Sequence, residues 1–276
     1  MNKKSSSIAS TDSKIARSQV VDILSIQRTL ARRFLLIFLV PLVAVAILGG
    51  YAYTLSLRLA QVEVGDKIHT IERVIARTGN LDYAIQEYEA LLASHHSPQI
   101  LARLGGLYVK RTESSAHSRE DDIHRAQNLL EQVIALAADA PETEYWRATH
   151  TLASLYVGLG PAYWAEALRV GEQAIAQNPL DAETLNNLAW VYAKTTDVAL
   201  RDLDKAERYV KRAVQLTNWS NYDIVDTLVV VLEMRGKRAE AIAALEQAQD
   251  KVLSGKRVTY EDLEQQLVKL KQEKTA

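Results

Sequence analysis

The sequence contains no cysteine and little glycine or proline. Its 276 residues include 11 glycines and 5 prolines. Without cysteine the chain has no disulfide framework, no cysteine-ligated zinc site and no lipoprotein anchor. The absence fits any redox compartment, so it does not place the protein. Scarce glycine and proline, with 48% hydrophobic and 24% charged residues, exclude disordered and collagen-like chains and favour long helices.

Motifs that mark catalytic or cofactor sites are also missing. The chain has no Gly-x-x-x-x-Gly-Lys loop, no His-Glu-x-x-His and no Gly-x-Ser-x-Gly. The stretch from Gly158 to Tyr163 lacks the third glycine of a dinucleotide fingerprint. Potential metal ligands cluster without the fixed spacing of a metal site, at His117, Asp121, Asp122 and His124. We therefore expect no enzymatic activity, cofactor, metal or small-molecule substrate.

One long hydrophobic run is present. Residues 34–57 contain no charged side chain. As a helix they reach about 36 Å, slightly more than a hydrocarbon core of about 30 Å. Pro41 removes one backbone donor, so a mild kink is expected there. We predict a transmembrane helix that contacts the lipid bilayer; the alternative is a signal peptide cleaved near Gly50-Tyr51-Ala52, against which the long leader argues.

The leader, residues 1–33, is a polar and basic tail. Seven lysines and arginines outweigh two aspartates, which gives a formal charge of +5. Residues 58–77 carry fewer basic residues, so the bias favours a cytoplasmic N-terminus. We expect a single-pass protein of a bacterial inner (cytoplasmic) membrane, with its C-terminal domain periplasmic. Apolar side chains in residues 18–31 predict a juxtamembrane helix, although a solvated leader fits equally well.

The rest of the chain is acidic. The whole chain has a formal charge of −1, so the residues from Leu59 onward carry −7 once the leader and Arg58 are set aside. Nucleic-acid binding requires clustered lysine and arginine to neutralise phosphates. We therefore expect no nucleic-acid partner.

A helix-hairpin pattern recurs along this acidic part. The first helix of each hairpin has large apolar residues three and four apart, and the second has small residues that permit close approach. The second helices of the last two hairpins contain Ala206, Ala213, Ala241 and Ala248. The first-helix motif appears as Leu104-Gly105-x-x-Tyr108, Leu152-Ala153-x-x-Tyr156 and Leu188-Ala189-x-x-Tyr192.

This pattern resembles the tetratricopeptide repeat, which has a period of about 34 residues and a Leu-Gly-x-x-Tyr core. The sequence of residues 185–192 looks like that of bacterial members of the family. The resemblance implies an all-α solenoid of helical hairpins, because each hairpin must stack on a neighbour to bury its apolar face. An ordinary helical bundle with chance periodicity is the alternative. The repeat domain is expected over 58–253, with units at 65–98, 98–141, 146–179, 182–218 and 222–253.

A last helix is expected over residues 257–274. Thr259 fits an N-cap, and Asp262 follows three residues later. The apolar stripe comprises Leu263, Leu267 and Leu270. We interpret this helix as the cap of the terminal repeat. The alternative is a free amphipathic helix that binds a partner.

The resemblance also implies a groove lined by first helices, in which a protein partner binds. Carried over by register, the groove residues are Arg147, His150, Ser154, Asn186, Trp190, Asp226, Val230 and Glu233. Packing between units is the alternative role for Trp190. The family's clamp for C-terminal carboxylates needs lysine and asparagine at set places. This chain has Ala102, Gly106, His150 and Asn186 there, a departure that argues against that activity.

The expected function is that of a membrane-anchored scaffold or adaptor. It would bind a protein partner and support the assembly or stability of a membrane-associated complex. The alternative is a structural accessory subunit whose transmembrane helix packs into a larger complex through Pro41, Gly49 and Gly50, because small residues permit close helix approach. A polar insertion at residues 111–122 is either an idle surface loop or a further partner contact.

Overall fold

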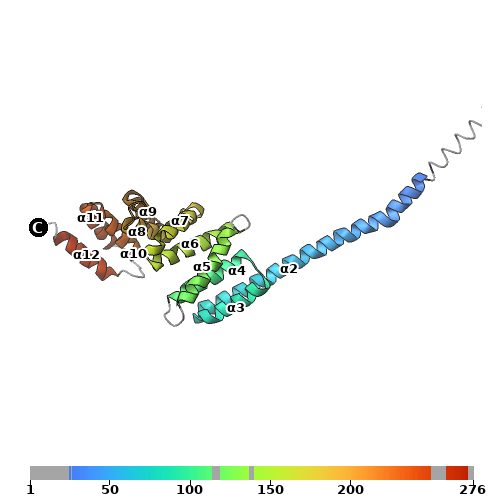
Figure 1. Ribbon diagram of the computed structural model, residues 1–276, viewed down its shortest axis with the longest axis horizontal. Helices are drawn as coiled ribbons and strands as arrows, with labels where there is room; N and C mark the ends of the chain where they lie inside the picture. Colours follow the sequence, from blue (N-terminus) through green and yellow to red (C-terminus); the bar gives the residue numbers. More distant parts are fainter. Residues whose placement is uncertain (1–24, 26, 114–118, 137–139, 250–258, 273–276) are drawn as a thin grey trace, which may run out of the picture. The chain divides into compact units, whose positions relative to one another are not determined.

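The computed structural model describes residues 25, 27–113, 119–136, 140–249 and 259–272 (Figure 1). These residues form helices joined by turns and short loops, and no strand occurs within these ranges. The chain divides into two compact units, unit 1 at residues 1–69 and unit 2 at residues 70–276. Most of the predicted basic tail, with much of the juxtamembrane helix, lies outside the described residues.

Unit 1 contains a long apolar helix with one irregular turn. A π-helical segment, η1 (Leu35–Leu39), leads into α2 (Val40–Thr78), which continues past the unit boundary. Val40 donates its N–H to the carbonyl oxygen of Leu35, five residues earlier. The next residue, Pro41, has no N–H and its ring crowds the preceding turn. The irregularity expected at this proline therefore takes the form of a widened turn.

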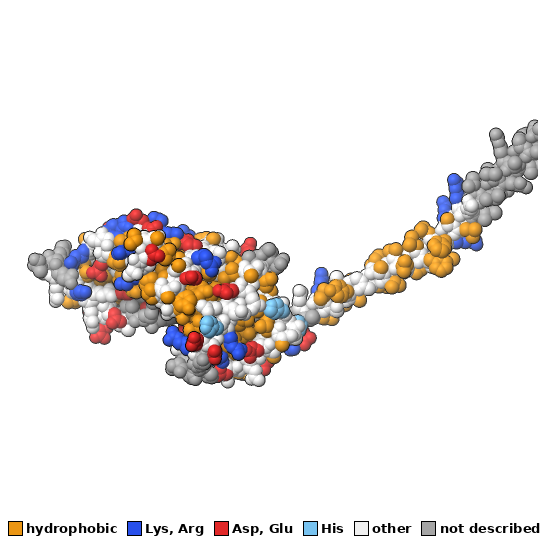
Figure 2. Space-filling model, viewed as in Figure 1, with side chains coloured by type: hydrophobic (Ala, Val, Ile, Leu, Met, Phe, Trp, Pro, Cys, Tyr) orange, Lys and Arg blue, Asp and Glu red, His pale blue; other side chains and the backbone are white. Residues whose placement is uncertain are grey.

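The hydrophobic side chains of residues 34–57 are exposed along the helix (Figure 2). The helix from Gln27 to Thr78 is long and apolar enough to cross a membrane, by length and composition, and its most apolar window is not buried within the described protein. A helix that is hydrophobic all round is normally surrounded by protein or by lipid. We therefore expect either protein or lipid to surround the apolar surface of this helix.

Unit 2 is a series of helical hairpins (Figure 1). After the end of α2, its helices are α3 (Leu81–Ser94), α4 (Pro98–Thr112), α5 (Arg119–Ala135), α6 (Glu142–Leu159), η2 (Pro161–Tyr163), α7 (Trp164–Gln177), α8 (Ala182–Lys194), α9 (Leu203–Leu216), α10 (Tyr222–Met234), α11 (Arg238–Gln249) and α12 (Tyr260–Gln272).

The hairpins stack in chain order. In each hairpin a first helix packs on a second: α4 on α5, α6 on α7, α8 on α9, and α10 on α11. Each second helix also contacts the next first helix, and successive first helices contact one another. This regular order distinguishes a solenoid from a bundle. The predicted all-α hairpin solenoid is confirmed, whereas the exact limits of the five units stay a prediction.

Local sequence signals set the ends of the helices. Side chains at five N-caps accept a hydrogen bond from the backbone N–H three residues later, which satisfies a donor that the helix leaves unpaired. These caps are Asn80, Ser97, Asp181, Asp202 and Asn221. The turn after α10 contains Gly236 with a φ of +71°, a conformation that glycine adopts without steric cost. The hairpin turns therefore follow from residue types that the sequence displays.

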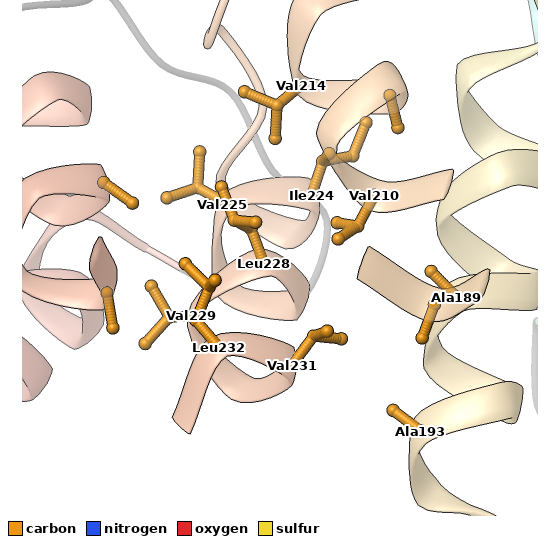
Figure 3. Packing of buried hydrophobic residues seen from close by; sticks show 14 of the residues in the cluster. Ala189, Ala193, Val210, Val214, Ile224, Val225, Leu228, Val229, Val231 and Leu232 are labelled. Atoms are coloured by element: carbon orange, nitrogen blue, oxygen red, sulfur yellow. The ribbon is translucent and has the colours of Figure 1, made fainter. Parts of the chain in front are cut away.

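The last two hairpins share a cluster of buried hydrophobic residues, part of which is drawn in Figure 3. The four alanines predicted to permit close approach, Ala206, Ala213, Ala241 and Ala248, are all buried. The same cluster contains branched residues of α10, including Val225, Val229 and Leu232. Close packing of this kind is sensitive to a change of a single methylene group.

Two glycines permit a still closer approach, Gly105 between the two helices of one hairpin and Gly171 between successive hairpins. A Cβ atom at Gly105 of α4 would lie 2.7 Å from Cγ of Leu130 in α5. A Cβ atom at Gly171 of α7 would lie 2.5 Å from Cδ2 of Leu188 in α8. Both leucines are fully buried, so neither has free space into which to move. Glycine is therefore required at these two positions for packing rather than for backbone conformation.

The tyrosine of the repeat motif makes the same contact in three successive hairpins. In each, its hydroxyl donates a hydrogen bond to a glutamate on the preceding second helix: Tyr108 to Glu89 at 2.5 Å, Tyr156 to Glu131 at 3.0 Å, and Tyr192 to Glu172 at 2.7 Å. Burial, and then the neighbouring glutamate, raise the pKa of Tyr156 to about 12. The hydroxyl therefore remains protonated and links one hairpin to the next.

An ion pair joins the two ends of the polar insertion. Arg111 lies at the end of α4 and Asp122 in the first turn of α5. The Arg111 Nε and Nη2 atoms donate to the two Asp122 carboxylate oxygens at 2.8 and 2.6 Å, and Nη1 donates to Asp82 at 2.7 Å. This two-bond geometry is the strong form of an arginine–carboxylate pair. Of the insertion, residues 114–118 lie outside the described residues.

The last helix, α12, packs on α11 and α10. Leu263, Leu267 and Leu270, the predicted apolar stripe, are buried. Thr259 and Asp262 exchange hydrogen bonds at the start of the helix, with the Thr259 N–H 2.7 Å from Asp262 Oδ2 and the Asp262 N–H 3.3 Å from Thr259 Oγ1. This is a capping box formed with aspartate. The leucines of α12 therefore cover the terminal hairpin.

Candidate functional site

The first helices α4, α6, α8 and α10 lie next to one another in the stack, and we call the face that they form the first-helix surface. The predicted groove residues come from three of them. Arg147, His150 and Ser154 belong to α6, Asn186 and Trp190 to α8, and Asp226, Val230 and Glu233 to α10. A contact between any of them and a partner stays a prediction, but the structure gives the surroundings of each.

The residues of α6 form a polar link to α8. His150 Nδ1 lies 2.7 Å from Asp181 Oδ2 and 2.9 Å from Thr184 Oγ1. Farther along the same pair of helices, Asn187 Nδ2 donates to Ser154 Oγ at 3.2 Å. These contacts join first helices of successive hairpins. His150 and Ser154 therefore have a role within the solenoid as well as a place on its surface.

Asp181 is the centre of the link around His150. Its carboxylate caps α8 at the Thr184 N–H, accepts from the Thr184 hydroxyl at 2.6 Å, and lies 3.3 Å from Trp146 Nε1. Burial opposes the charge of Asp181, but hydrogen bonds from His150 and Thr184 outweigh it and lower the pKa to about 2. Burial likewise lowers the pKa of His150, yet Asp181 outweighs it and the net shift is upward from 6.5.

The sign of each shift fixes how this pair affects stability. A histidine whose folded pKa is raised contributes stability below pH 6.5 and loses it as the pH rises through the folded pKa. An aspartate whose folded pKa is lowered to about 2 contributes above its usual pKa and loses that stability as the pH falls toward 2. The pair is therefore expected to stabilise the domain most between about pH 4 and pH 6.5.

We predict that Asp181→Asn lowers the pKa of His150 below 6.5, because burial of the ring remains while the carboxylate that favours its charged form is gone. Asparagine keeps the ability to cap α8. The measurement is an NMR titration of the His150 ring nitrogens in the wild type and the variant. An unchanged pKa in the variant would contradict the assignment of Asp181 as the partner that raises it.

The residues of α8 differ in their exposure. Asn186 is 4% exposed, and its Oδ1 makes no hydrogen bond within the described residues. Trp190 is half-buried, and the ammonium of Lys194 lies 5.1 Å from its ring centroid, a cation–π distance. Trp190 therefore presents part of its ring to solvent, whereas Asn186 does not present its side chain.

The residues of α10 lie partly beneath the last helix. Gln266 of α12 donates from Nε2 to Asp226 Oδ1 at 2.5 Å. Val230 is half-buried and Glu233 is exposed. The sequence pattern of α12 predicts its apolar contacts but not this polar one, because Gln266 lies outside the leucine stripe. The free part of the first-helix surface is therefore chiefly that of α4, α6 and α8.

The predicted membrane contacts lie in the exposed part of α2. Pro41, Gly49 and Gly50 are all exposed, and a Cβ atom at either glycine would meet nothing within 4 Å. Room is therefore available for another helix or for lipid, and contact with either stays a prediction. Among the described residues no group of three or more histidines, aspartates and glutamates is placed to hold a metal; His117 lies outside them.

The pattern of stacked hairpins defines a class of fold, the helical-repeat solenoid, and comparisons identify the repeat. Residues 170–208 match the family model for the tetratricopeptide repeat. The solved structure titled "MamA RS-1 ArsTM double mutant" is similar, with a TM-score of 0.52 and 16% identity over 67% of this chain and 94% of that chain. TTC0263, a thermophilic tetratricopeptide repeat protein of Thermus thermophilus, has a TM-score of 0.48 and 22% identity over 75% and 98% of the two chains.

No curated protein matches the sequence significantly. At 16% identity the likeness to the MamA variant concerns the fold alone. The chain contains a tetratricopeptide repeat, and unit 2 has the tetratricopeptide repeat fold. The resemblance found in the sequence is thereby confirmed. Stacked helical repeats of this kind create extended concave surfaces that such proteins use for binding.

Proposed function

We propose that the chain is a membrane-anchored adaptor that holds a protein partner on its first-helix surface and supports a membrane-associated complex. The observation that carries the proposal is the combination, in one chain, of an exposed apolar helix and a stacked-hairpin domain with partly exposed aromatic and charged groups. The hairpin domain is a binding fold, and the apolar helix would keep it beside lipid.

The membrane part of the proposal rests on residues 34–57. An exposed apolar helix of this length is stable in a bilayer and unfavourable in water. Basic residues cluster on its N-terminal side, with Arg32 and Arg33 next to the run. By the positive-inside rule the N-terminus would be cytoplasmic and the repeat domain periplasmic, with the helix in the inner membrane of a bacterium.

The tether would make a weak binding surface effective. Confinement of adaptor and partner to one membrane raises their effective concentration, to the millimolar range for short linkers. The adaptor would then need only modest affinity for each partner. This fits a surface that offers a few anchor groups, such as Trp190 with Lys194, rather than one deep cavity.

The test of this function is crosslinking in native membranes followed by purification of the full chain. We expect Arg147→Glu and Trp190→Ala each to lower recovery of the crosslinked partner by about tenfold, because large aromatic and arginine side chains dominate interface energies. Arg208→Glu, at an exposed position on α9, is the matched control and should leave recovery unchanged. Undiminished recovery from both test variants, with the helical content intact, would remove the first-helix surface from the proposal.

The open space around Gly49 and Gly50 favours a second candidate function, that of an accessory subunit whose membrane helix itself packs into a larger complex. Replacing residues 34–57 by an unrelated membrane helix separates the two functions. Partner recovery survives the replacement if the repeats bind the partner. Recovery is lost if the membrane helix does.

A further inference from the structure

Helix α2 carries an exposed apolar stripe that continues past the end of the uncharged run at residues 34–57. The stripe consists of Leu55, Leu59 and Val62, which are four and three residues apart and are 45%, 62% and 61% exposed. Alternating intervals of three and four residues keep one side of a helix apolar, and they are the spacing of the a and d positions of a coiled coil. The stripe therefore has the pattern of a helix that packs lengthwise against another helix.

The stripe is not on the side of α2 that is buried within the protein. Ile68 is 2% exposed and follows Leu59 by nine residues, which is about two and a half helical turns. The two residues therefore point in opposite directions. Val64, which is partly buried, lies on the same side as Ile68, because four residues make about one turn. The side that carries the stripe remains available to a partner.

Lipid tails do not account for the whole stripe. Residues 34–57 already reach about 36 Å as a helix, which exceeds a hydrocarbon core of about 30 Å. Val62 lies about 7.5 Å beyond the end of that run, at about 1.5 Å per residue. The charged residues Arg58 and Glu63 flank Leu59 and Val62, so this turn of the helix belongs in the polar layer next to the membrane. Large apolar side chains in that layer are stabilised when another apolar surface covers them.

The charges beside the stripe favour a second copy of the same helix. In a parallel coiled coil, position g of one helix pairs with position e of the next heptad in the other helix. With Leu59 at a and Val62 at d, the g position is Arg58 and the e position five residues later is Glu63. Both side chains are exposed and their charges are opposite. Two copies related by a two-fold axis would form this ion pair twice.

The ion pair that Glu63 makes within its own chain leaves room for this contact. Its carboxylate lies 3.4 Å from Nζ of Lys67, and the two side chains are 71% and 57% exposed. A carboxylate has two oxygens and accepts from more than one donor. The arginine of a neighbouring copy can therefore reach Glu63 without displacing the lysine.

We propose that α2 pairs in parallel with α2 of a second copy of this chain along Leu55, Leu59 and Val62. Copies that cross one membrane in the same direction can meet only in parallel, as the charges require. Asp66 occupies the next position of the stripe, where two facing carboxylates would repel, so the contact ends after Val62. The inference rests on the membrane anchoring in the proposed function. It adds that one complex would meet two copies of the first-helix surface.

The test is disulfide crosslinking of the full chain in native membranes. The sequence contains no cysteine, so a single introduced cysteine reports on one position. The variants are Leu59→Cys and Val62→Cys on the stripe, with Gln61→Cys as the matched control, exposed at the same depth but on the other side of the helix. A disulfide requires Cα atoms within about 7 Å, so we expect each stripe variant to give at least about fivefold more product of twice the chain mass than the control.

A second measurement tests the charges, with Leu55→Cys as the reporter. Arg58→Glu places like charges opposite one another and should lower the disulfide yield about threefold, the size expected for exposed ion pairs. Adding Glu63→Arg restores opposite charges and should recover the yield. Lys67→Gln removes only the pair within the chain and should leave the yield unchanged.

Yields that do not differ between Leu59→Cys and Gln61→Cys would overturn the proposal, as would a double charge reversal that does not recover the yield. A disulfide product of another mass would assign the stripe to a different protein and would overturn it too. Alkaline extraction of the same membranes separates this result from the proposed function. If the chain stays with the lipid and the yields do not differ, only the pairing fails. If the chain is extracted, the membrane anchoring fails and the pairing fails with it.

Discussion

Replacing Leu188 with alanine is expected to lower the free energy of unfolding of the repeat domain by about 2–5 kcal/mol. Leu188 is fully buried in α8, and its Cδ atoms lie against the backbone of Gly171 in α7. Removal of its branched end loses apolar burial and leaves a cavity between two hairpins that cannot close without shifting a helix. The measurement is urea-induced unfolding of the full chain in detergent micelles, followed by circular dichroism.

Leu180→Ala is the matched control. Leu180 lies in the turn before α8 and is 64% exposed, so its loss should change the free energy of unfolding by no more than about 0.5 kcal/mol. Equal effects of the two leucine substitutions would contradict the packing described for Leu188.

The facing glycine offers a sharper test of the same contact. Gly171→Ala should cost about 1–3 kcal/mol in the wild type, because its Cβ would overlap Leu188. In the Leu188→Ala background the overlap is gone, and alanine also favours the helix by up to about 1 kcal/mol relative to glycine. The double variant should therefore be more stable than the sum of the single effects predicts. Strict additivity would show that the two residues do not share this space.

Arg111→Ala is the second substitution with a large expected effect, about 3–5 kcal/mol of destabilisation. The Asp122 carboxylate that Arg111 pairs with is only 4% exposed, so removal of the arginine leaves a buried charge without its bidentate partner. The guanidinium also lies 5.2 Å from the Tyr108 ring centroid. Thermal unfolding of the full chain in detergent micelles, at constant ionic strength, would measure the loss.

Arg125→Ala provides the comparison, because Arg125 lies over the same Tyr108 ring, at 5.6 Å, and pairs with Glu89. Its side chain is 59% exposed and that of Glu89 is 45% exposed. Exposed ion pairs contribute about 0–1 kcal/mol, since solvent screens them. A larger loss from Arg125→Ala than from Arg111→Ala would show that burial of the carboxylate does not set the energy.

The core positions of unit 2 could be predicted from the sequence because the spacing of its apolar residues repeats. A leucine three or four residues from the next apolar position can face only one side of a helix, and an alanine opposite it permits close approach. This is why Leu188, Ala206 and Ala213 were recognisable as core positions, and all are buried. The hairpin order followed from the same recurrence.

The polar contacts of unit 2 could not be predicted from the sequence in the same way. Arg111 and Asp122 are separated by a run of charged and small residues that reads as a loop, and nothing in their spacing indicates that they meet. Asn186 occupies a first-helix position that the family register assigns to the groove, yet tight packing buries it. Tyr88 and Arg103 lie on different helices, so their convergence on one pocket depends on the angle at which hairpins stack.

The ion pair between Arg111 and Asp122 has a consequence for the insertion that it closes. The number of residues in the insertion should not affect how the helices stack. Since these residues fix the end of α4 against the start of α5, the chain between them can gain or lose residues without altering how the helices meet. Lengthening a loop whose ends are already held together adds only a logarithmic entropy cost. A fluorescent protein or an affinity tag grafted at this place would therefore report on the protein inside cells while leaving both ends of the polypeptide untouched.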